Sequence, residues 1–290
     1  MALDGVFGQA AGLLLGDIAK AGGIDHEPVG TFFLLQVLNG RGIAGADVFM
    51  VTARHLIEQF DNIEALMRDV GGDPITWPVS EWALPSDPVI DIAVARWEYP
   101  EEANLPFRAI PSDDSYENFD PGAPPKAGVS VYFVGLLAPL RDLAMRGVPV
   151  VRTAAVSAWN ESGVIWRDRE PPFRQWRAEH AHLIDTRSFG GFSGGPALLQ
   201  HTFPGPREKP MPESWAMRTK KAGNDPDAMG DIHTMTMWCG MFTAFIDETG
   251  IGVVVRSADI MEFIENSPEV QVMREKNGTE NETKTPNQGR

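Results

Sequence analysis

FGGFSGGP, residues 189–196, is the most informative run in this chain of 290 residues. The glycines on either side of Ser193 allow the positive φ angles and tight turns that other residues avoid. Such a turn holds a serine hydroxyl away from the backbone and can direct two N–H groups, here those of Gly191 and Ser193, at one point. Pro196 lacks an N–H, which is tolerated at the first position of a strand. The run therefore predicts either a reactive serine on an exposed turn or a plain glycine-rich turn with an incidental serine.

Two earlier segments hold the side chains that a reactive serine requires. VTARHL (51–56) ends an apolar run and contains His55, and DIAVAR (91–96) begins with Asp91 inside another apolar run. A serine hydroxyl is a weak nucleophile unless a base lies beside it, and a carboxylate among core residues is costly unless it is paired. Considered alone, His55 could be a half-buried structural histidine, and Asp91 could be an aspartate that caps a turn. Taken together, the order His55, Asp91, Ser193 is one of the chain orders known for Ser-His-Asp triads.

Most of the chain predicts short strands, which makes the expected fold all-β. The 29 glycines and 23 prolines are spread throughout, and apolar runs of strand length lie between them. The expected strands are 31–38, 47–53, 89–97, 129–134, 148–156, 182–186, 196–200, 234–246 and 251–256. Helical spacing is confined to 55–70 and 257–265, and the apolar stretch 10–15 fits a short packing helix or an arm. This pattern indicates a β-sandwich or β-barrels.

Two irregular stretches divide the chain. Residues 110–126, IPSDDSYENFDPGAPPK, are polar and proline-rich, and they mark a seam between two β-rich parts. Residues 201–231 are expected to form a long surface loop, and the polar segment after residue 266 is expected to be disordered. The predicted organisation is an N-terminal arm, a first β-barrel, a second β-barrel and a disordered tail. Their boundaries are 1–29, 30–125, 126–266 and 267–290.

VTARHL, DIAVAR and GFSGGPAL together resemble the histidine, aspartate and serine motifs of the trypsin-like serine peptidases, most of all those of the HtrA-like bacterial branch. The resemblance extends from about residue 30 to residue 265 and includes 129–137, 239–244 and 250–256. It implies two six-stranded β-barrels with short helices, a C-terminal helix and an active site in the cleft between the barrels. It leaves no length for the PDZ domain that HtrA-like proteins usually add.

The resemblance also implies a serine endopeptidase and a role for each matching residue. Ser193 would attack the scissile carbonyl, and His55 would take the hydroxyl proton and pass it to the leaving amine. Asp91 would fix the tautomer of the imidazole and stabilise the imidazolium. The N–H groups of Gly191 and Ser193 would form the oxyanion hole.

The expected substrate-binding residues follow from the same resemblance. Counting back from Ser193 places Arg187 near the floor of the pocket, where it would favour an acidic substrate side chain. Pairing of Arg187 with Asp185 or another structural carboxylate is the alternative. Gly252 would keep the pocket entrance open. The backbone expected to pair with a substrate strand is that of Thr243, Ala244 and Phe245.

Three features depart from the pattern of this family. Phe192 stands where many relatives activated by cleavage have an aspartate that pairs with the new N-terminus, so activation of that kind is not expected. Arg54 is expected at the surface, either solvated or in a salt bridge. Residues 166–176 interleave arginines with tryptophans and are expected to form a surface loop near the cleft. Phe192 and the long loop 201–231 leave room for a latent cleft that needs a partner. The alternatives are therefore a binding or regulatory module of this fold and an esterase that uses the same triad.

Charge and cysteine content limit the expected surroundings and partners. The 25 Lys+Arg and 40 Asp+Glu residues give a formal charge of −15, which disfavours binding to nucleic acid or an anionic membrane. The single cysteine, Cys239, cannot form an internal disulfide, which favours a reducing, cytoplasmic location. No signal peptide and no membrane span are predicted. No cofactor or metal is expected, since His180 and His182 lack further ligands. The expected partners are a protein or peptide substrate and a regulatory protein.

Overall fold

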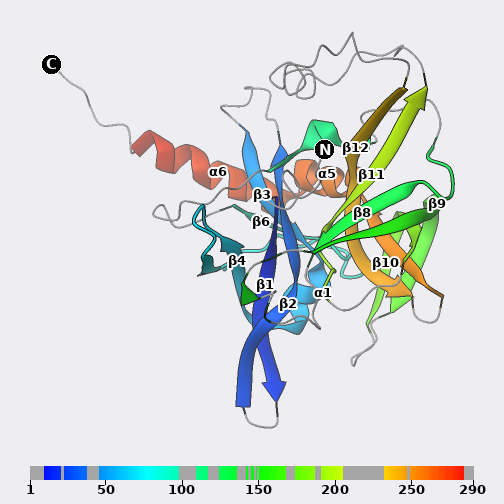
Figure 1. Cartoon of the computed structure of the whole chain (residues 1–290). Coiled ribbons are helices and arrows are strands. Elements are labelled where there is room, and N and C mark those ends of the chain that lie inside the picture. The colour runs from blue at the N-terminus through cyan, green and yellow to red at the C-terminus, as the bar shows by residue number, and fades with distance from the viewer. Residues whose placement is uncertain are drawn as a thin grey trace.

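The structure is a computed structural model of the chain. It describes residues 10–20, 23–37, 46–97, 109–116, 124–135, 142, 145–146, 148, 150–167, 174–186, 191–204, 232–246 and 249–283. Strands in two sheets make up most of these residues, and helices are few (Figure 1). No helix in this described part of the chain is long and apolar enough to cross a membrane.

The first sheet has seven strands, in the order β5-β4-β1-β2-β3-β6, with the short β7 pairing in parallel with β2. Its strands are β1 (Ala11–Lys20), β2 (Gly23–Val37), β3 (Asp47–Thr52), β4 (Asp61–Arg68), β5 (Pro74–Pro78), β6 (Ala93–Arg96) and β7 (Ile110–Pro111). The helix α1 (Arg54–Gln59) follows β3, and a 3-10 turn (Ser112–Asp114) follows β7. The resemblance implied six strands here, one fewer than the structure has. The expected strands 31–38, 47–53 and 89–97 correspond to β2, β3 and β6, whereas β1, β4, β5 and β7 were not predicted as strands.

The second sheet closes as a six-stranded barrel in the order β10-β13-β12-β11-β8-β9, as predicted. Its strands are β8 (Ser130–Gly135), β9 (Val150–Arg167), β10 (Gln175–Asp185), β11 (Pro196–Pro204), β12 (Ile232–Ile246) and β13 (Ile251–Arg256). Two helices come after it, α5 (Ser257–Asn266) and α6 (Pro268–Thr283). The predicted all-β class and the predicted helix after β13 are both confirmed.

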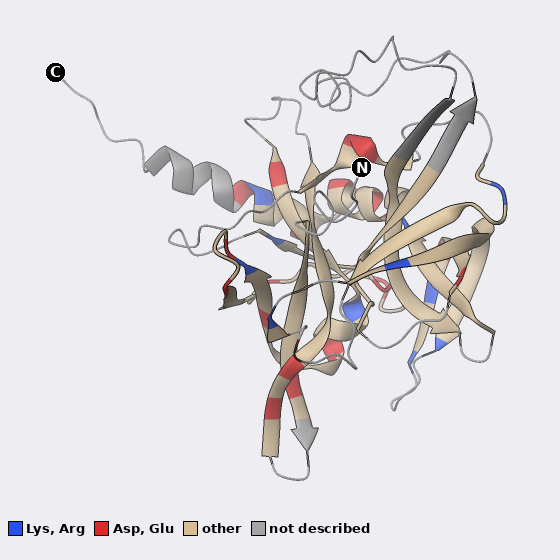
Figure 2. Cartoon of the chain, in the orientation of Figure 1, with Lys and Arg blue, Asp and Glu red and all other residues tan. Residues whose placement is uncertain are grey.

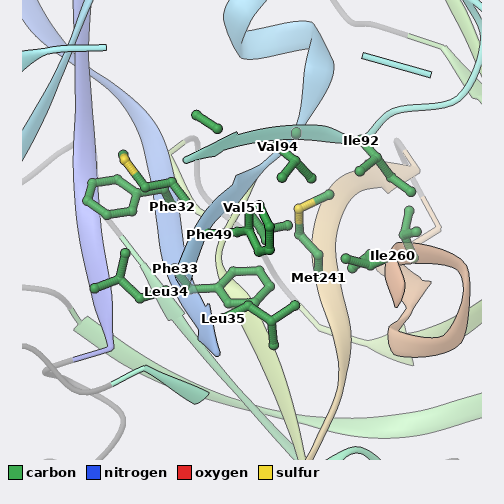
Figure 3. Packing of buried hydrophobic residues seen from close by; sticks show 14 of the residues in the cluster. Phe32, Phe33, Leu34, Leu35, Phe49, Val51, Ile92, Val94, Met241 and Ile260 are labelled. Atoms are coloured by element: carbon green, nitrogen blue, oxygen red, sulfur yellow. The ribbon is translucent and has the colours of Figure 1, made fainter. Parts of the chain in front are cut away.

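A single hydrophobic cluster contains residues from both sheets. Residues 31–35 of β2 are all buried, so this strand is covered on both faces. A strand buried on both faces is encoded as a continuous apolar run, which is how FFLL appears in the sequence. Figure 3 shows Met241 of β12 and Ile260 of α5 pointing into the same region as Phe49 and Val51 of β3. The first sheet and the second barrel therefore share a packed core.

The predicted N-terminal arm is wrong for its described residues, because β1 and the start of β2 form a hairpin of the first sheet. The hairpin register runs from Ala11 opposite Phe33 to Lys20 opposite Gly23, and β1 also pairs with β4. Leu13 is fully buried, so the apolar stretch at 10–15 is a core strand and not a packing helix. The far half of the hairpin extends away from the sheets and carries acidic side chains (Figure 2).

The predicted helix over 55–70 is correct only for its first part. α1 ends at Gln59, and residues 61–68 form β4 between β1 and β5. Asn62 has a φ of +51°, a left-handed conformation that interrupts a right-handed helix. The 3–4 residue spacing of apolar side chains is overridden by pairing with two strands, since Ile63, Ala65 and Met67 also alternate as a strand requires.

The predicted disordered tail is contradicted over residues 268–283, which form α6. The hydroxyl of Ser267 accepts a hydrogen bond from the N–H of Val270 at 3.3 Å, and Pro268 occupies the first helical position. Val270 and Met273 lie one turn apart and are 0% and 8% exposed. Two apolar side chains were enough to dock the first turns of this polar helix, although they were too few to stand out in the sequence.

The predicted surface loop at 166–176 is wrong at both of its ends. Trp166 lies in β9 and Trp176 in β10, opposite each other in the antiparallel ladder. Both are core residues, with exposed fractions of 5% and 0%. Of the arginines in this segment, Arg167 adjoins the buried Trp166 and Arg174 lies two residues before the buried Trp176.

Candidate active site

His55 and Asp91 are joined directly at the edge of the first sheet. His55 lies in the first turn of α1, and Asp91 precedes β6 by two residues. The Oδ1 atom of Asp91 accepts the backbone N–H of His55 at 2.9 Å, and Oδ2 lies 2.8 Å from the imidazole Nδ1. Because an ionised carboxylate can only accept hydrogen bonds, Nδ1 carries the proton of the neutral ring. The other ring nitrogen, Nε2, is then the basic one.

Thr243 completes the surroundings of Asp91, which is fully buried. The Thr243 hydroxyl donates to Oδ2 of Asp91. The pairing of β12 with β13 shifts register between Phe242 and Ala244, so Thr243 lies at a β-bulge. A bulge turns a side chain out of the regular ladder, and here it turns the hydroxyl toward Asp91. The sequence predicted only a backbone role for Thr243, because the bulge depends on how two distant strands pair.

Ser193 lies on a turn that is held against the first sheet. Thr31 of β2 donates its N–H to the carbonyl of Ser193 at 2.9 Å and its hydroxyl to the carbonyl of Gly191 at 2.8 Å. Thr52 of β3 donates its hydroxyl to the carbonyl of Thr31 at 2.7 Å. The serine that precedes β11 of the second barrel is therefore fixed relative to β2 and β3, the strands that lead to His55.

The two glycines after Ser193 allow the backbone of the turn to approach both sheets. Gly194 has a φ of +83°, and a Cβ there would lie closer than 3.0 Å to the carbonyl of Thr31 and the hydroxyl of Thr52. The N–H of Gly194 donates to the carbonyl of Phe242 at 2.8 Å, and the N–H of Phe242 donates to the carbonyl of Gly195 at 2.8 Å. A side chain at Gly194 would separate these contacts. This geometry fits a functional tight turn around Ser193 better than it fits a plain glycine-rich turn with an incidental serine.

Phe192 anchors the same turn inside the second barrel. Its side chain is 1% exposed, and its ring centroid lies 5.1 Å from that of Phe133 in an edge-to-face arrangement. Phe133 in turn stacks on Phe242, again with 5.1 Å between centroids. Aromatic packing thus fixes the residue before Ser193, where a buried aspartate would need a partner charge.

The N–H groups of Gly191 and Ser193 donate to no protein acceptor among the described residues. The oxyanion hole expected from these two N–H groups stays a prediction. The Ser193 hydroxyl donates to the carbonyl of Thr243 at 2.9 Å. A hydroxyl has one proton, so attack on a substrate requires this group to turn from Thr243 to Nε2 of His55.

Arg54, next to His55 in α1, is 8% exposed. The expected surface position is therefore wrong, and of its two alternatives the salt bridge applies: Nε donates to Oε1 of Glu58 at 2.8 Å. Burial lowers the pKa of the Arg54 guanidinium, while the negative charges of Asp91 and Asp87 act in the opposite direction. Arg54 is thus a buried cation close to the His55–Asp91 pair.

The predicted substrate-binding residues differ in whether the structure describes them and in where they lie. Arg187 lies outside the described residues. Gly252 is buried, and a Cβ there would come within 2.7 Å of the Phe242 ring and 2.9 Å of the Thr186 methyl group. A side chain at this position would therefore clash with its neighbours, and the role of Gly252 at a pocket entrance stays a prediction. The residues expected to pair with a substrate strand lie on β12 next to the site: Thr243, Ala244 and Phe245.

The two sheets, with His55 and Asp91 on the first and Ser193 on the second, define the trypsin-like serine protease fold. The crystal structure of Deg5 is similar, with a TM-score of 0.51 and 14% sequence identity over 90% of this chain and 91% of that chain. The crystal structure of a thermostable serine protease, AL20, from an extremophilic microorganism has a TM-score of 0.45 and 12% identity, over 87% of this chain and 94% of that chain. No protein-family model and no curated protein matches the sequence. At 14% identity the similarity to Deg5 establishes the fold alone, so the activity must be argued from the site.

Proposed function

We propose that this protein is a serine endopeptidase that hydrolyses peptide bonds in protein substrates through His55, Asp91 and Ser193. The observation that carries the proposal is the buried carboxylate of Asp91, bonded to both the backbone and the ring of His55. A buried charge is costly unless its partners are fixed, and this arrangement leaves Nε2 of His55 as a base. The glycine turn of Ser193, seated on β2, supplies the nucleophile that such a base would serve.

The proposed reaction has two stages. Ser193 Oγ forms a bond to the scissile carbonyl carbon while Nε2 of His55 takes the hydroxyl proton. The N–H groups of Gly191 and Ser193 stabilise the negative oxygen, and Asp91 stabilises the imidazolium. The imidazolium gives its proton to the leaving amine, which departs and leaves an acyl-enzyme. Water, deprotonated by His55, then cleaves the ester and restores Ser193.

A latent form is the second proposal, and the hydrogen bond from Ser193 to the carbonyl of Thr243 favours it. While the hydroxyl donates to Thr243, its proton is not directed at Nε2. A partner or substrate strand that binds along β12 would compete for the backbone of this segment and release the hydroxyl. The extreme case is a binding or regulatory module of this fold with little proteolytic activity.

The proposed setting follows from the sequence features already described. The resemblance of the motifs suggests an HtrA-like bacterial peptidase. The lone Cys239, which is buried and free, suits a reducing cytoplasm. The proposed partners are protein or peptide substrates and a regulatory protein, with no metal or organic cofactor in the chemistry.

The test is labelling of the purified chain with a fluorophosphonate, followed by identification of the modified residue. The unaltered chain should be labelled at Ser193, and Ser193→Ala should lose all labelling and all hydrolysis. Peptide and small-ester substrates, compared on the same preparation, separate an endopeptidase from an esterase. Labelling that persists at full strength in Ser193→Ala would exclude Ser193 as the nucleophile. Labelling that appears only after a partner is added would support the latent form.

A further inference from the structure

We infer that Arg54, Glu58 and Arg174 form an ionic clamp between α1 and β10 that positions His55 against the second barrel. This inference rests on the proposed function, because it assigns positioning residues to the same site. Arg54 and Glu58 come from α1, on the first sheet's side, and Arg174 immediately precedes β10 of the second barrel. None of the three belongs to the triad or to the oxyanion turn.

The first half of the clamp ties α1 to the segment that leads to Asp91. One guanidinium nitrogen of Arg54 donates to the carbonyls of Pro85 and Asp87, at 2.9 and 3.1 Å, while Nε donates to Glu58. A buried arginine is stable only when its N–H donors have acceptors, and these three oxygen atoms hold the guanidinium group of Arg54 in place. Arg54, the residue before His55, thereby binds the loop that precedes Asp91. This gives His55 and Asp91 a second connection.

The second half of the clamp reaches across to the second barrel. Oε1 of Glu58 accepts from Arg54, and Oε2 accepts from Arg174. Arg174 also donates to the carbonyl of Pro88 at 3.3 Å. Burial lowers the pKa of the Arg174 guanidinium. The positive charge of Arg54 lowers it further, because the two cations repel each other. Glu58 is the group that allows both guanidinium groups to lie there.

A backbone contact continues the clamp along β10. The N–H of Arg177 donates to the carbonyl of Val89 at 2.8 Å, two residues before Asp91. The Arg177 side chain lies 3.1 Å from the carboxylate of Asp87. The start of β10 is therefore bonded to the loop 85–89 by backbone as well as by side chains.

The clamp places Trp176 beside the histidine. The Trp176 ring is fully buried, and its centroid lies 6.1 Å from that of the His55 imidazole. The Arg174 guanidinium lies over the same indole, 4.7 Å from its centroid. Release of Arg174 would free the end of β10 and let the indole move away. Water would then reach the His55–Asp91 pair and weaken the hydrogen bonds that orient the imidazole.

The experiment compares Glu58→Gln, Arg174→Gln and the double variant in the full chain. Glu58→Gln leaves two guanidinium groups facing each other without their shared anion, so the rate of fluorophosphonate labelling should fall about tenfold. Arg174→Gln removes the cation that ties β10 to Glu58 and covers Trp176, so labelling should slow by a similar factor. The double variant breaks the same contact, so it should label within about threefold of the slower single variant and not at the product of the two losses, a non-additive result expected of groups in one network. With a small ester substrate kcat should fall while KM stays within about twofold.

Arg256→Gln is the matched control, because Arg256 also pairs with a carboxylate on a neighbouring helix, that of Asp259. It lies outside the clamp and should leave the labelling rate unchanged. A Glu58→Gln variant that labels like the control, or a double variant slowed by the full product of the two single losses, would overturn the clamp.

Hydrogen exchange gives a readout that does not depend on activity. Exchange of the Arg177 amide, which is bonded to Val89, should accelerate about tenfold or more in Glu58→Gln. The Thr186 amide, bonded to the carbonyl of Gly250 at 2.9 Å at the other end of β10, should not change. If the unaltered chain is neither labelled nor active, with or without added partners, the proposed function fails, and the exchange result alone decides the clamp. Equal exchange of the Arg177 amide in Glu58→Gln and Arg256→Gln would refute it.

Discussion

Gly194→Ala is the change that most directly tests how the two sheets meet at Ser193. The added Cβ would lie closer than 3.0 Å to the carbonyl of Thr31 and the hydroxyl of Thr52. Relief requires movement of β2 or of the turn, which strains the hydrogen bonds from Thr31 to Ser193 and from Thr52 to Thr31. The left-handed φ of +83° adds about 1–2 kcal/mol for any non-glycine residue. Overpacking adds about 1–3 kcal/mol and each lost buried hydrogen bond about 1 kcal/mol or more, so the total should exceed about 4 kcal/mol.

Gly128→Ala provides the matched control for this change. Gly128 has a φ of +89°, nearly that of Gly194, but a Cβ there meets no atom within 4 Å. Its cost should be limited to the backbone strain of about 1–2 kcal/mol. The difference between the two variants isolates the close approach of the sheets from the conformational preference of glycine.

Urea unfolding followed by tryptophan fluorescence measures both free energies of unfolding, and fluorophosphonate labelling measures the site. Gly194→Ala should unfold at a much lower urea concentration than Gly128→Ala and should not be labelled under conditions where it remains folded. If the two variants differ by less than about 1 kcal/mol and both are labelled at the normal rate, the turn does not hold the sheets together as described.

Three further changes probe the surroundings of the triad. Asp91→Asn should lower turnover by about 10⁴, the loss known for the corresponding change in a triad of this class; a loss below about tenfold would contradict its role. Thr243→Val removes the hydroxyl bonded to Asp91 at nearly constant volume, and kcat should fall by about tenfold while the free energy of unfolding changes by about 1–2 kcal/mol. Phe192→Ala leaves a cavity beside Phe133 and should cost about 3–5 kcal/mol in urea unfolding, against which Phe192→Leu, which keeps most of the volume, should cost clearly less.

The sequence predicted those parts of the site whose chemistry demands particular residue types. The glycine after Ser193 can be recognised in the sequence as a structural requirement, because the fold leaves no room for a Cβ there. The carboxylate of Asp91 is readable because a charge within an apolar run needs a partner. These requirements act on single positions, so they remain visible in one sequence. The triad order followed from them together with the family resemblance.

The parts that the sequence did not predict depend on pairing between distant segments. Arg54 is polar and next to a turn, and only the folded loop 85–87 supplies the carbonyls that bury it. Thr243 approaches Asp91 because of a bulge in the β12–β13 ladder. The segment 61–68 carries both a helical and an alternating pattern, and β1 and β5 decide between them. In each case the deciding partner lies far away in the chain, where local periodicity gives no information.

The contacts that surround the proposed triad also join the two sheets. The only cysteine, Cys239, is free, so no internal disulfide connects them. Thr31 binds the turn of Ser193, Thr243 binds Asp91, and Arg177 binds Val89, and each of these hydrogen bonds spans the boundary between the sheets. Each also lies within a few residues of a triad member. A perturbation that loosens the docking of the sheets must therefore disturb the site, which gives a partner bound at the boundary a direct physical route to control the proposed activity.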